Sequence, residues 1–389
     1  MPRRAKRVLI LSASYGAGHN QVSRALQEGI KSIDPTTEVD IVDFFQFVSE
    51  PFNRLTQTLY VQSVRRLPAG YGLFYKRTGH IPPDSVWQRQ LNHLGKENLL
   101  DYLDRHDPDL IVCTFPTPAG VLSELKEEGL VDVPVHVVIT DYVVHSQWIH
   151  PHVDRYYVAD GSVGAGLEER GMAPDRITVT GIPIRREFAG RVDRADARTA
   201  LDLSQEMPAV LVMAGAFSML GGLPEIVRVL ERLEVPHQTI VIAGHDKKLE
   251  KRLKTITKNA LFPVRVLGFV EDVKSYMSAA DLIISKTGGI TVAEALACGL
   301  PLVAFNVIPG QEASNCKFLL KKGAARYARQ PAQLESVLRR LLNEPDALAR
   351  MSRAAAALAR PDAALDVAAS ILNTPVTYAR ELAISDTPA

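Results

Sequence analysis

The chain has 389 residues, which is enough for two domains with complete hydrophobic cores. Lys and Arg (45) almost balance Asp and Glu (44), so charge gives no reason to expect a nucleic acid as partner. Three cysteines without metal-site spacing predict free thiols in a reducing cytosol, and no apolar run approaches the ~20 residues that span a bilayer, so any membrane contact should be peripheral.

Short apolar runs alternate with helical patterns along the chain, which predicts an α/β fold with parallel, doubly wound sheets. Two sets of five runs, with a Pro- and Gly-containing break between them, predict two Rossmann-like domains that face each other across a cleft. The strands are expected at 8–11, 39–42, 110–113, 135–140 and 156–159 in the first sheet, and at 209–214, 238–243, 264–267, 282–285 and 302–305 in the second.

The break and the composition around it suggest the domain limits. Residues 1–185 form the predicted first domain, 186–203 a linker and 204–360 the second domain. The segment 361–389 is helical and Ala-rich at its start, and we expect it to pack back across the domain junction.

A glycine turn follows the first strand and ends in His19, before a helix expected from about Gln21. Gln21 stands where a dinucleotide fingerprint has its third glycine, so NAD binding is not expected. His19 should face the cleft, where its neutral imidazole can take a proton from an incoming hydroxyl, and a helix N-terminus disfavours the imidazolium. A lone histidine is more often structural, but its place on this turn favours a catalytic base.

Between about 44 and 100 no strand is expected, and aromatic and apolar residues recur at helical spacing beside basic ones. Such a segment can lie on an anionic bilayer surface. The commoner alternative is a helix that packs its apolar face on the first domain. The residues expected to contact a membrane are Phe52, Arg65, Arg66, Phe74, Lys76 and Arg77.

Two further patterns lie in the first half. Asp107-Pro-Asp109 mimics the metal motif of some glycosyltransferases, but it precedes a strand and is interpreted as a turn, so no metal site is expected. After the strand at 135–140, His145 and Trp148 are candidates to line an acceptor pocket, although His145 could equally be a surface histidine.

Glycine turns recur in the second half at the ends of strands, where backbone N–H groups and a helix dipole suit a diphosphate. Glu294 lies one helical turn after the glycine turn at 286–289. Its carboxylate can accept hydrogen bonds from ribose hydroxyls, or it can form a capping box with Thr291. Phe269 can wall a uracil site or pack in the core. The predicted donor-binding residues are Gly215, Ser218, Gly268, Phe269, Lys286, Thr287, Gly288, Gly289, Thr291, Glu294, Gly310, Gln311 and Glu312.

These motifs as a set resemble the family of monogalactosyldiacylglycerol synthases and processive diacylglycerol glucosyltransferases, relatives of the lipid-II-forming N-acetylglucosaminyltransferase. The resemblance covers nearly the whole chain. It rests on residues 16–19, 140–148, 180–185 and 286–294, and on Pro309-Gly-Gln-Glu312 with Asn315, which favours the diacylglycerol branch. Ala17 replaces a usual glycine, and residues 287–289 depart from the usual turn, which leaves the fine donor specificity open.

The resemblance implies a GT-B fold and an inverting enzyme that moves a hexose from UDP-glucose or UDP-galactose to diacylglycerol. It implies a catalytic base at His19 and an acceptor side with Gly18, ribose binding at Glu294, and sugar binding at Gln311 and Glu312. It also implies no cofactor beyond the donor, and a place on the inner face of the cell membrane. A UDP-sugar 2-epimerase, a peptidoglycan-precursor N-acetylglucosaminyltransferase and a non-catalytic UDP-sugar sensor are the alternatives.

Overall fold

The structure is a computed structural model that describes residues 5–14, 17–48, 68–79, 95–190, 192–213 and 222–375. Within these ranges it leaves out the side chains of Ala17, Pro68, Ala69, Tyr71 and Phe74. The predicted site residues Phe52, Arg65, Arg66, Gly215 and Ser218 lie outside the described residues, and so does the side chain of Phe74.

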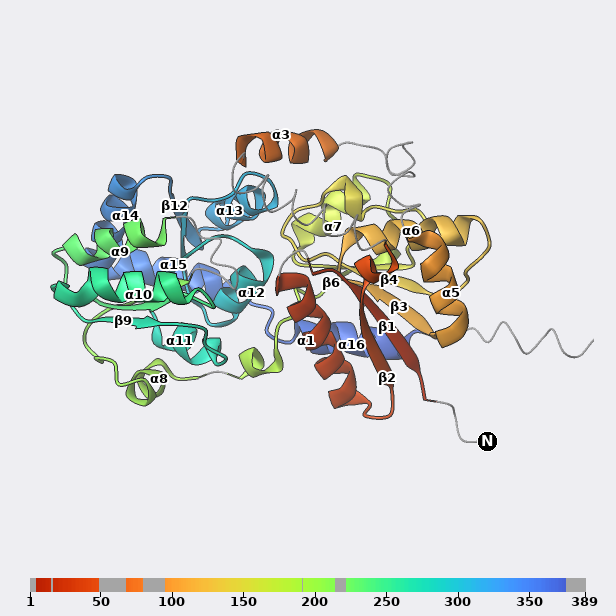
Figure 1. The fold of residues 1–389 in the computed structure, drawn as a ribbon, viewed down its shortest axis with the longest axis horizontal. Helices are drawn as coiled ribbons and strands as arrows, with labels where there is room; N and C mark the ends of the chain where they lie inside the picture. Colours follow the sequence, from red (N-terminus) through yellow and green to blue (C-terminus); the bar gives the residue numbers. More distant parts are fainter. Residues whose placement is uncertain are drawn as a thin grey trace, which may run out of the picture.

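The first domain is built on a parallel six-stranded sheet in the order β2-β1-β3-β4-β5-β6 (Figure 1). Its five predicted strands are present, and the sixth, β6, is a three-residue edge strand that the apolar pattern did not indicate. The strands are β1 (Arg7–Ser12), β2 (Glu38–Asp43), β3 (Leu110–Cys113), β4 (Val135–Val138), β5 (Arg155–Val158) and β6 (Ile177–Val179).

Helices and short 3-10 turns connect these strands, as parallel pairing requires. From residue 44 to 100 the described part of the chain contains helices and no strand, as predicted. The helical elements are α1 (Ala17–Ile33), η1 (Phe44–Phe47), α3 (Pro68–Thr78), α5 (Lys96–His106), α6 (Pro116–Glu127), η2 (Ser146–Trp148), α7 (Gly161–Glu168) and η3 (Pro174–Arg176).

The second domain repeats this plan with a parallel sheet in the order β12-β11-β10-β7-β8-β9. Here too the five predicted strands are present and one edge strand, β12, adds to them. The strands are β7 (Ala209–Met213), β8 (Gln238–Ile242), β9 (Val264–Leu267), β10 (Leu282–Ser285), β11 (Leu302–Phe305) and β12 (Ala325–Ala328).

Both faces of the second sheet are covered, which explains why its central strands are continuously apolar. In β7, Val210 and Val212 point into one buried cluster, whereas Leu211 and Met213 point into the other. The helical elements of the second domain are α8 (Arg194–Ala200), α9 (Leu223–Arg232), α10 (Lys247–Ile256), η5 (Thr257–Asn259), α11 (Val273–Ala279), α12 (Gly289–Ala297), α13 (Gln311–Lys321), α14 (Pro331–Asn343) and α15 (Pro345–Ala357). The short turn η4 (Arg186–Ala189) precedes them, and α16 (Ala363–Asn373) follows them.

The chain crosses between the domains twice, and the two crossings touch. Gly181, two residues after β6, has a φ of 94°, and a Cβ there would lie 2.4 Å from Arg360 Cβ. After the second crossing, α16 packs against α1 of the first domain (Figure 1). Lys6 Nζ donates to the carbonyl oxygens of Ile371 (2.7 Å) and Thr374 (2.8 Å), which satisfies acceptors at the end of α16.

Helix α8 lies inside the segment predicted as linker, but it packs on α11 of the second domain. Arg198 of α8 donates to the Ala279 carbonyl oxygen at 3.0 Å and forms an ion pair with Asp281. The residues that join the domains without packing on a sheet are therefore those around η4.

The contact between α1 and α16 provides a test of how the chain's C-terminal segment is held. A Cβ at Gly29 would lie 2.8 Å from the Ala364 carbonyl oxygen, so Gly29→Leu must push the helices apart. Overpacking of this kind typically costs ~1–3 kcal/mol, and we expect the free energy of unfolding to fall by about 2 kcal/mol.

The control is Gly161→Leu, because a Cβ at Gly161 meets nothing within 4 Å. We expect it to change the free energy of unfolding by less than about 0.5 kcal/mol. Chemical denaturation of the two variants measures both values, and equal midpoints would contradict the tight contact between α1 and α16.

Candidate active site

The carboxyl ends of the two sheets face each other, and the loops that follow β4 and β10 are in direct contact. A Cβ built on Gly289, at the start of α12, would lie 1.9 Å from the Thr140 carbonyl oxygen. A Cβ on Gly18, in the first turn of α1, would lie 3.6 Å from Ile290 Cγ1. The two domains thus meet at the edge where open α/β sheets bind ligands.

His19 lies in the first turn of α1, which begins at Ala17, four residues before the predicted start at Gln21. Its Nδ1 atom is 2.8 Å from the Thr114 carbonyl oxygen and 3.3 Å from Thr140 Oγ1. Because a carbonyl oxygen only accepts, the contact with Thr114 places the ring proton on Nδ1. Nε2 is then left with a free lone pair, as a general base requires.

The surroundings keep this imidazole neutral. Burial lowers the pKa of His19 to about 4, against the smaller raising effect of its hydrogen bond to the Thr114 carbonyl. The edge of the Phe115 ring packs on it at a centroid distance of 5.1 Å. At neutral pH the side chain is therefore the unprotonated form that can accept a proton.

The turn between β10 and α12 opens a helix toward the cleft. Thr287 is fully buried, and its Oγ1 donates to the Glu312 carbonyl oxygen at 2.6 Å. The helix begins at Gly289 with Gly288 as N-cap, so Thr291 lies inside it and does not cap it. The capping-box alternative is therefore wrong, and Glu294 is not used to satisfy its own helix terminus.

Glu294 is instead a buried carboxyl at the domain junction. Burial raises its pKa to about 7, and Arg185 opposes this shift from 4.0 Å away. Arg185 also pairs with Glu187 at 3.0 Å, so it is shared between two carboxylates. Glu294 consequently lacks full compensation, which suits a group that receives hydroxyl donors from a ligand.

The Pro309-Gly310 turn after β11 starts α13 at Gln311 and directs Glu312 into the same region. Gly310 has a φ of 117°, a conformation that favours glycine. Glu312 Oε1 accepts from Lys286 Nζ at 3.0 Å, whereas its buried Oε2 has no hydrogen-bond partner among the described residues. An unpaired buried carboxylate oxygen is costly, and a ligand hydroxyl would relieve that cost.

Phe269, next to Gly268 after β9, is 52% exposed, so the alternative that it packs in the core is wrong. Its ring stacks on His245, with centroids 4.1 Å apart and planes 14° apart. His245 follows β8 and was missed in the sequence, because only the pairing of β8 with β9 brings it beside Phe269. The two rings form an exposed aromatic platform at the ligand edge.

His145 and Trp148, predicted on the acceptor side, are both buried. His145 Nε2 lies 3.1 Å from the Tyr75 carbonyl oxygen, its Nδ1 accepts from the Gln147 amide at 3.3 Å, and its ring packs on the Tyr75 ring. The structure thus places His145 as a tether for α3. Its acceptor-binding role stays a prediction, and so does that of Trp148.

Helix α3 carries the predicted basic residues Lys76 and Arg77, which are exposed in its last turn. Although α3 belongs to the first half of the chain, it lies beside α13 of the second domain (Figure 1). A Cβ on Gly72 would lie 2.4 Å from Pro309 Cβ, which shows that α3 rests on the Pro-Gly turn. The candidate membrane segment and the candidate donor turn are therefore in contact.

Asp107 and Asp109, which mimic a metal motif, lie at the opposite edge of the first sheet. Asp107 forms an ion pair with Arg7 at 2.7 Å, and Asp109 accepts from the Arg7 amide at 2.7 Å. They close a turn, as predicted. Among the described residues, no group of His, Cys, Asp and Glu is arranged to hold a metal ion.

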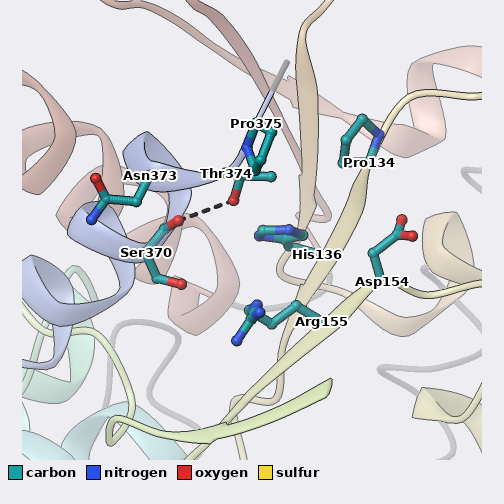
Figure 2. A pocket seen from close by; sticks show the side chains of 8 residues that line it. All are labelled: Pro134, His136, Asp154, Arg155, Ser370, Asn373, Thr374 and Pro375. Atoms are coloured by element: carbon teal, nitrogen blue, oxygen red, sulfur yellow. Dashed lines mark hydrogen bonds between the residues drawn. The ribbon is translucent and has the colours of Figure 1, made fainter. Parts of the chain in front are cut away.

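A pocket of about 520 Å³ also lies at that opposite edge (Figure 2). Figure 2 shows His136, the second residue of β4, and Arg155, the first residue of β5, facing the end of α16. Tyr157 Oη lies 3.1 Å from His136 Nδ1 and donates to Ser370 Oγ at 2.8 Å. This pocket lies where the strands start, so it is separate from the site around His19.

Comparison with known proteins agrees with the fold and with this site. The family described as monogalactosyldiacylglycerol (MGDG) synthase matches residues 19–184, and that described as glycosyl transferases group 1 matches residues 199–358. Among solved structures, MurG of Acinetobacter baumannii is similar, with a TM-score of 0.65 at 18% identity over 95% of this chain and 100% of that one. HepE of Anabaena in complex with UDP-glucose has a TM-score of 0.56 at 15% identity, covering 94% and 99%. By its fold and family domains, the protein is a GT-B glycosyltransferase.

Curated relatives indicate which family of glycosyltransferases the chain belongs to. A processive diacylglycerol β-glucosyltransferase of Bacillus licheniformis is 34% identical over 87% of this chain and 88% of the relative. That of Bacillus subtilis strain 168 is 32% identical, covering 90% of each, and that of Bacillus mycoides is 31% identical, covering 94% and 93%. The chain belongs to the family of monogalactosyldiacylglycerol synthases and processive diacylglycerol glucosyltransferases, so the predicted fold, enzyme class and family are confirmed.

The burial of Glu294 leads to a test of its role. Its pKa is raised to about 7 in the folded protein, so the stability it contributes is present below its unfolded pKa and is lost as pH rises through about 7. Glu294→Gln removes the buried charge. We therefore expect the variant to unfold at a higher temperature than the wild type at about pH 8, and at the same temperature at about pH 5.

The same substitution should weaken the binding of a UDP-sugar, because an amide is a poorer acceptor for hydroxyl donors than a carboxylate. Thermal unfolding at both pH values and calorimetric titration with UDP-glucose measure the two effects. Unchanged UDP-glucose affinity would exclude Glu294 as a donor ligand. A variant less stable than the wild type at about pH 8 would contradict the uncompensated burial.

Proposed function

We propose that the enzyme moves a hexose from a UDP-sugar to the 3-hydroxyl of diacylglycerol with inversion of configuration at the anomeric carbon. The observation that carries the proposal is the geometry of His19, a neutral imidazole with its ring proton on Nδ1, in the turn of α1 that contacts Ile290 of α12 through Gly18. The names of the curated relatives support diacylglycerol as acceptor and glucose as sugar. The structure of HepE with UDP-glucose supports the GT-B cleft as the donor site.

In the proposed step, His19 Nε2 takes the proton of the acceptor hydroxyl while the hydroxyl oxygen attacks the anomeric carbon. The bond between that carbon and the diphosphate oxygen breaks, and UDP leaves with the electron pair. The N–H groups at the start of α12 and the ammonium of Lys286 stabilise the charge that develops on the diphosphate. Attack from the face opposite UDP turns an α-linked donor into a β-glycoside.

Donor recognition is assigned to the groups around this step. We propose that Glu294 binds the ribose, that Gln311 and the unpaired oxygen of Glu312 bind the sugar, and that Gly268 and Phe269 hold the uracil. We propose that the diphosphate is bound at the start of α12, where Gly288 is the N-cap and Gly289 and Thr291 lie in the first turn. No cofactor besides the donor is needed for this chemistry.

The first test is release of UDP by the purified protein. UDP-glucose, UDP-galactose and UDP-N-acetylglucosamine are offered separately, with and without diacylglycerol in anionic vesicles. Lipid-dependent release identifies the donor and supports the proposal. Lipid-independent conversion of UDP-N-acetylglucosamine would support the epimerase, and tight donor binding without turnover would support the sensor.

His19→Ala is expected to lower kcat by about 10²- to 10⁴-fold, the usual range for loss of a general base. UDP-glucose affinity should change by less than about twofold, since His19 acts on the acceptor. His106→Ala is the matched control, because His106 is exposed and lies at the end of α5. Full turnover of His19→Ala would refute the assignment of the base.

We further propose that the enzyme acts on the inner face of the cell membrane and that α3 contributes to binding the anionic surface. No helix in the described part of the chain is long and apolar enough to cross a membrane. Lys76 and Arg77 project from α3, together with Leu73, which is 54% exposed. Basic and apolar side chains on one exposed helix fit an interfacial contact.

Reversing both charges, with Lys76→Glu and Arg77→Glu, tests this contact. Each basic residue near an anionic surface contributes ~1 kcal/mol, so the vesicle partition coefficient should fall by at least about 10-fold. Lys248→Glu with Lys251→Glu is the control, because these exposed residues lie on α10, on another side of the molecule (Figure 1). Sedimentation with phosphatidylglycerol vesicles measures the difference, and equal loss in both double variants would show a nonspecific charge effect.

A further inference from the structure

One asparagine makes the central polar contact between the domains. Asn315 lies on α13 of the second domain and is fully buried. Its Oδ1 accepts from the Tyr142 amide at 2.9 Å, and its Nδ2 donates to Asp141 Oδ1 at 2.9 Å and to the Thr287 carbonyl oxygen at 3.0 Å. One side chain thus holds the loop after β4 and the turn after β10 together.

Further contacts clamp the same first-domain segment, residues 140–142, onto the second domain. The Tyr142 ring stacks on Phe318 of α13, with centroids 4.8 Å apart. The Thr140 carbonyl oxygen faces Gly289 so closely that no side chain fits there. The position of residues 140–142 is therefore set by the second domain as well as by the first.

This segment is also a neighbour of the base. Thr140 Oγ1 lies 3.3 Å from His19 Nδ1, on the side of the ring where the Thr114 carbonyl fixes the proton. A shift of residues 140–142 would move Thr140 and change the orientation of the imidazole. The contacts form a continuous path from α13 through Thr140 to His19.

We propose that Asn315 is a positioning residue that locks residues 140–142 against the second domain and, through Thr140, orients His19 for proton abstraction. The inference rests on the proposed role of His19 as base, and it assigns to Asn315 a function apart from binding the donor. With this role of Asn315, His19 is correctly oriented toward the acceptor only when the two domains are in contact.

Charged groups lie near the contact between Asn315 and residues 140–142, and they make a charge substitution informative. Asp141 is half-buried, and burial raises its pKa to about 6, against the lowering effect of its hydrogen bond from Asn315. The other titratable groups that face it are Glu312 of α13, whose partner is Lys286, and Tyr75 of α3. A second carboxylate at position 315 would therefore meet a negative environment.

Asn315→Asp keeps an acceptor for the Tyr142 amide but replaces both N–H donors with a carboxylate that faces Asp141. We expect kcat to fall by about 10- to 100-fold at about pH 8, as for the loss of hydrogen bonds to a charged group. Adding Asp141→Asn restores a donor across the domains with the polarity reversed. The double variant should regain at least about one third of the loss on a logarithmic scale.

A pH series separates orientation from general damage. In Asn315→Asp, lowering the pH lets the two carboxyls share a proton, which restores a hydrogen bond between them. The kcat of this variant relative to the wild type should rise at least about threefold from pH 8 to pH 6. Asn315→Ala lacks the second carboxyl, so no proton can be shared across the domains, and its kcat relative to the wild type should rise by less than that of Asn315→Asp over the same range.

Small-angle scattering and circular dichroism accompany the kinetics. Asn315→Asp should remain folded with a larger radius of gyration than the wild type, and the double variant should return to the wild-type value. If Asn315→Asp does not fold, Gly289→Ala replaces it, since its Cβ must displace Thr140 and leaves Asn315 and Asp141 unchanged. That variant should show the same enlarged radius and lowered kcat.

Wild-type kcat in Asn315→Asp, or failure of Asp141→Asn to improve it, would overturn the proposal. The scattering measurements need no acceptor, so they test the interdomain lock even if the wild type transfers nothing to diacylglycerol. An enzyme without lipid transfer refutes the proposed function. An active enzyme that is indifferent to position 315 refutes the lock alone.

Discussion

The site depends on the close approach of two pieces of backbone, the Thr140 carbonyl and the start of α12 at Gly289. Each sheet presents the carboxyl ends of its strands at one edge, because all its strands are parallel. Neither edge alone holds both the proposed base, His19, and the proposed donor turn before α12. Glycine at position 289 lets the edges touch, and this contact brings the two candidate sites together.

The cleft contains buried carboxyl groups whose charge is only partly balanced by neighbouring cations and hydrogen-bond donors. Glu294 shares Arg185 with Glu187, and Glu312 uses only one oxygen for Lys286. Such groups cost stability, since burial without full pairing disfavours the charged form. In the proposed reaction the hydroxyl groups of the donor supply the missing hydrogen bonds, which would couple this cost to donor affinity.

The sequence predicted most of the fold, because buried parallel strands are continuous apolar runs and glycine turns follow them. It missed β6, which has only three residues, and β12, whose Arg326 and Tyr327 are exposed. Local motifs predicted His19, Glu294 and Glu312 as site residues. The sequence could not pair His245 with Phe269, nor Thr140 with His19, because these contacts depend on tertiary structure across 24 and 121 positions of the chain.

Helix α3 links this cleft to the membrane side of the proposed reaction. His145 of the first domain hydrogen-bonds to the Tyr75 carbonyl oxygen of this helix. The helix also packs through Gly72 on Pro309, which starts the turn leading to Gln311 and Glu312. A helix that touches both domains responds to their relative position. If α3 lies on the lipid surface, the acceptor enters the cleft beside α3, which also contacts the proposed donor turn at Pro309. Both substrates then meet at the domain junction where Asn315 makes its hydrogen bonds.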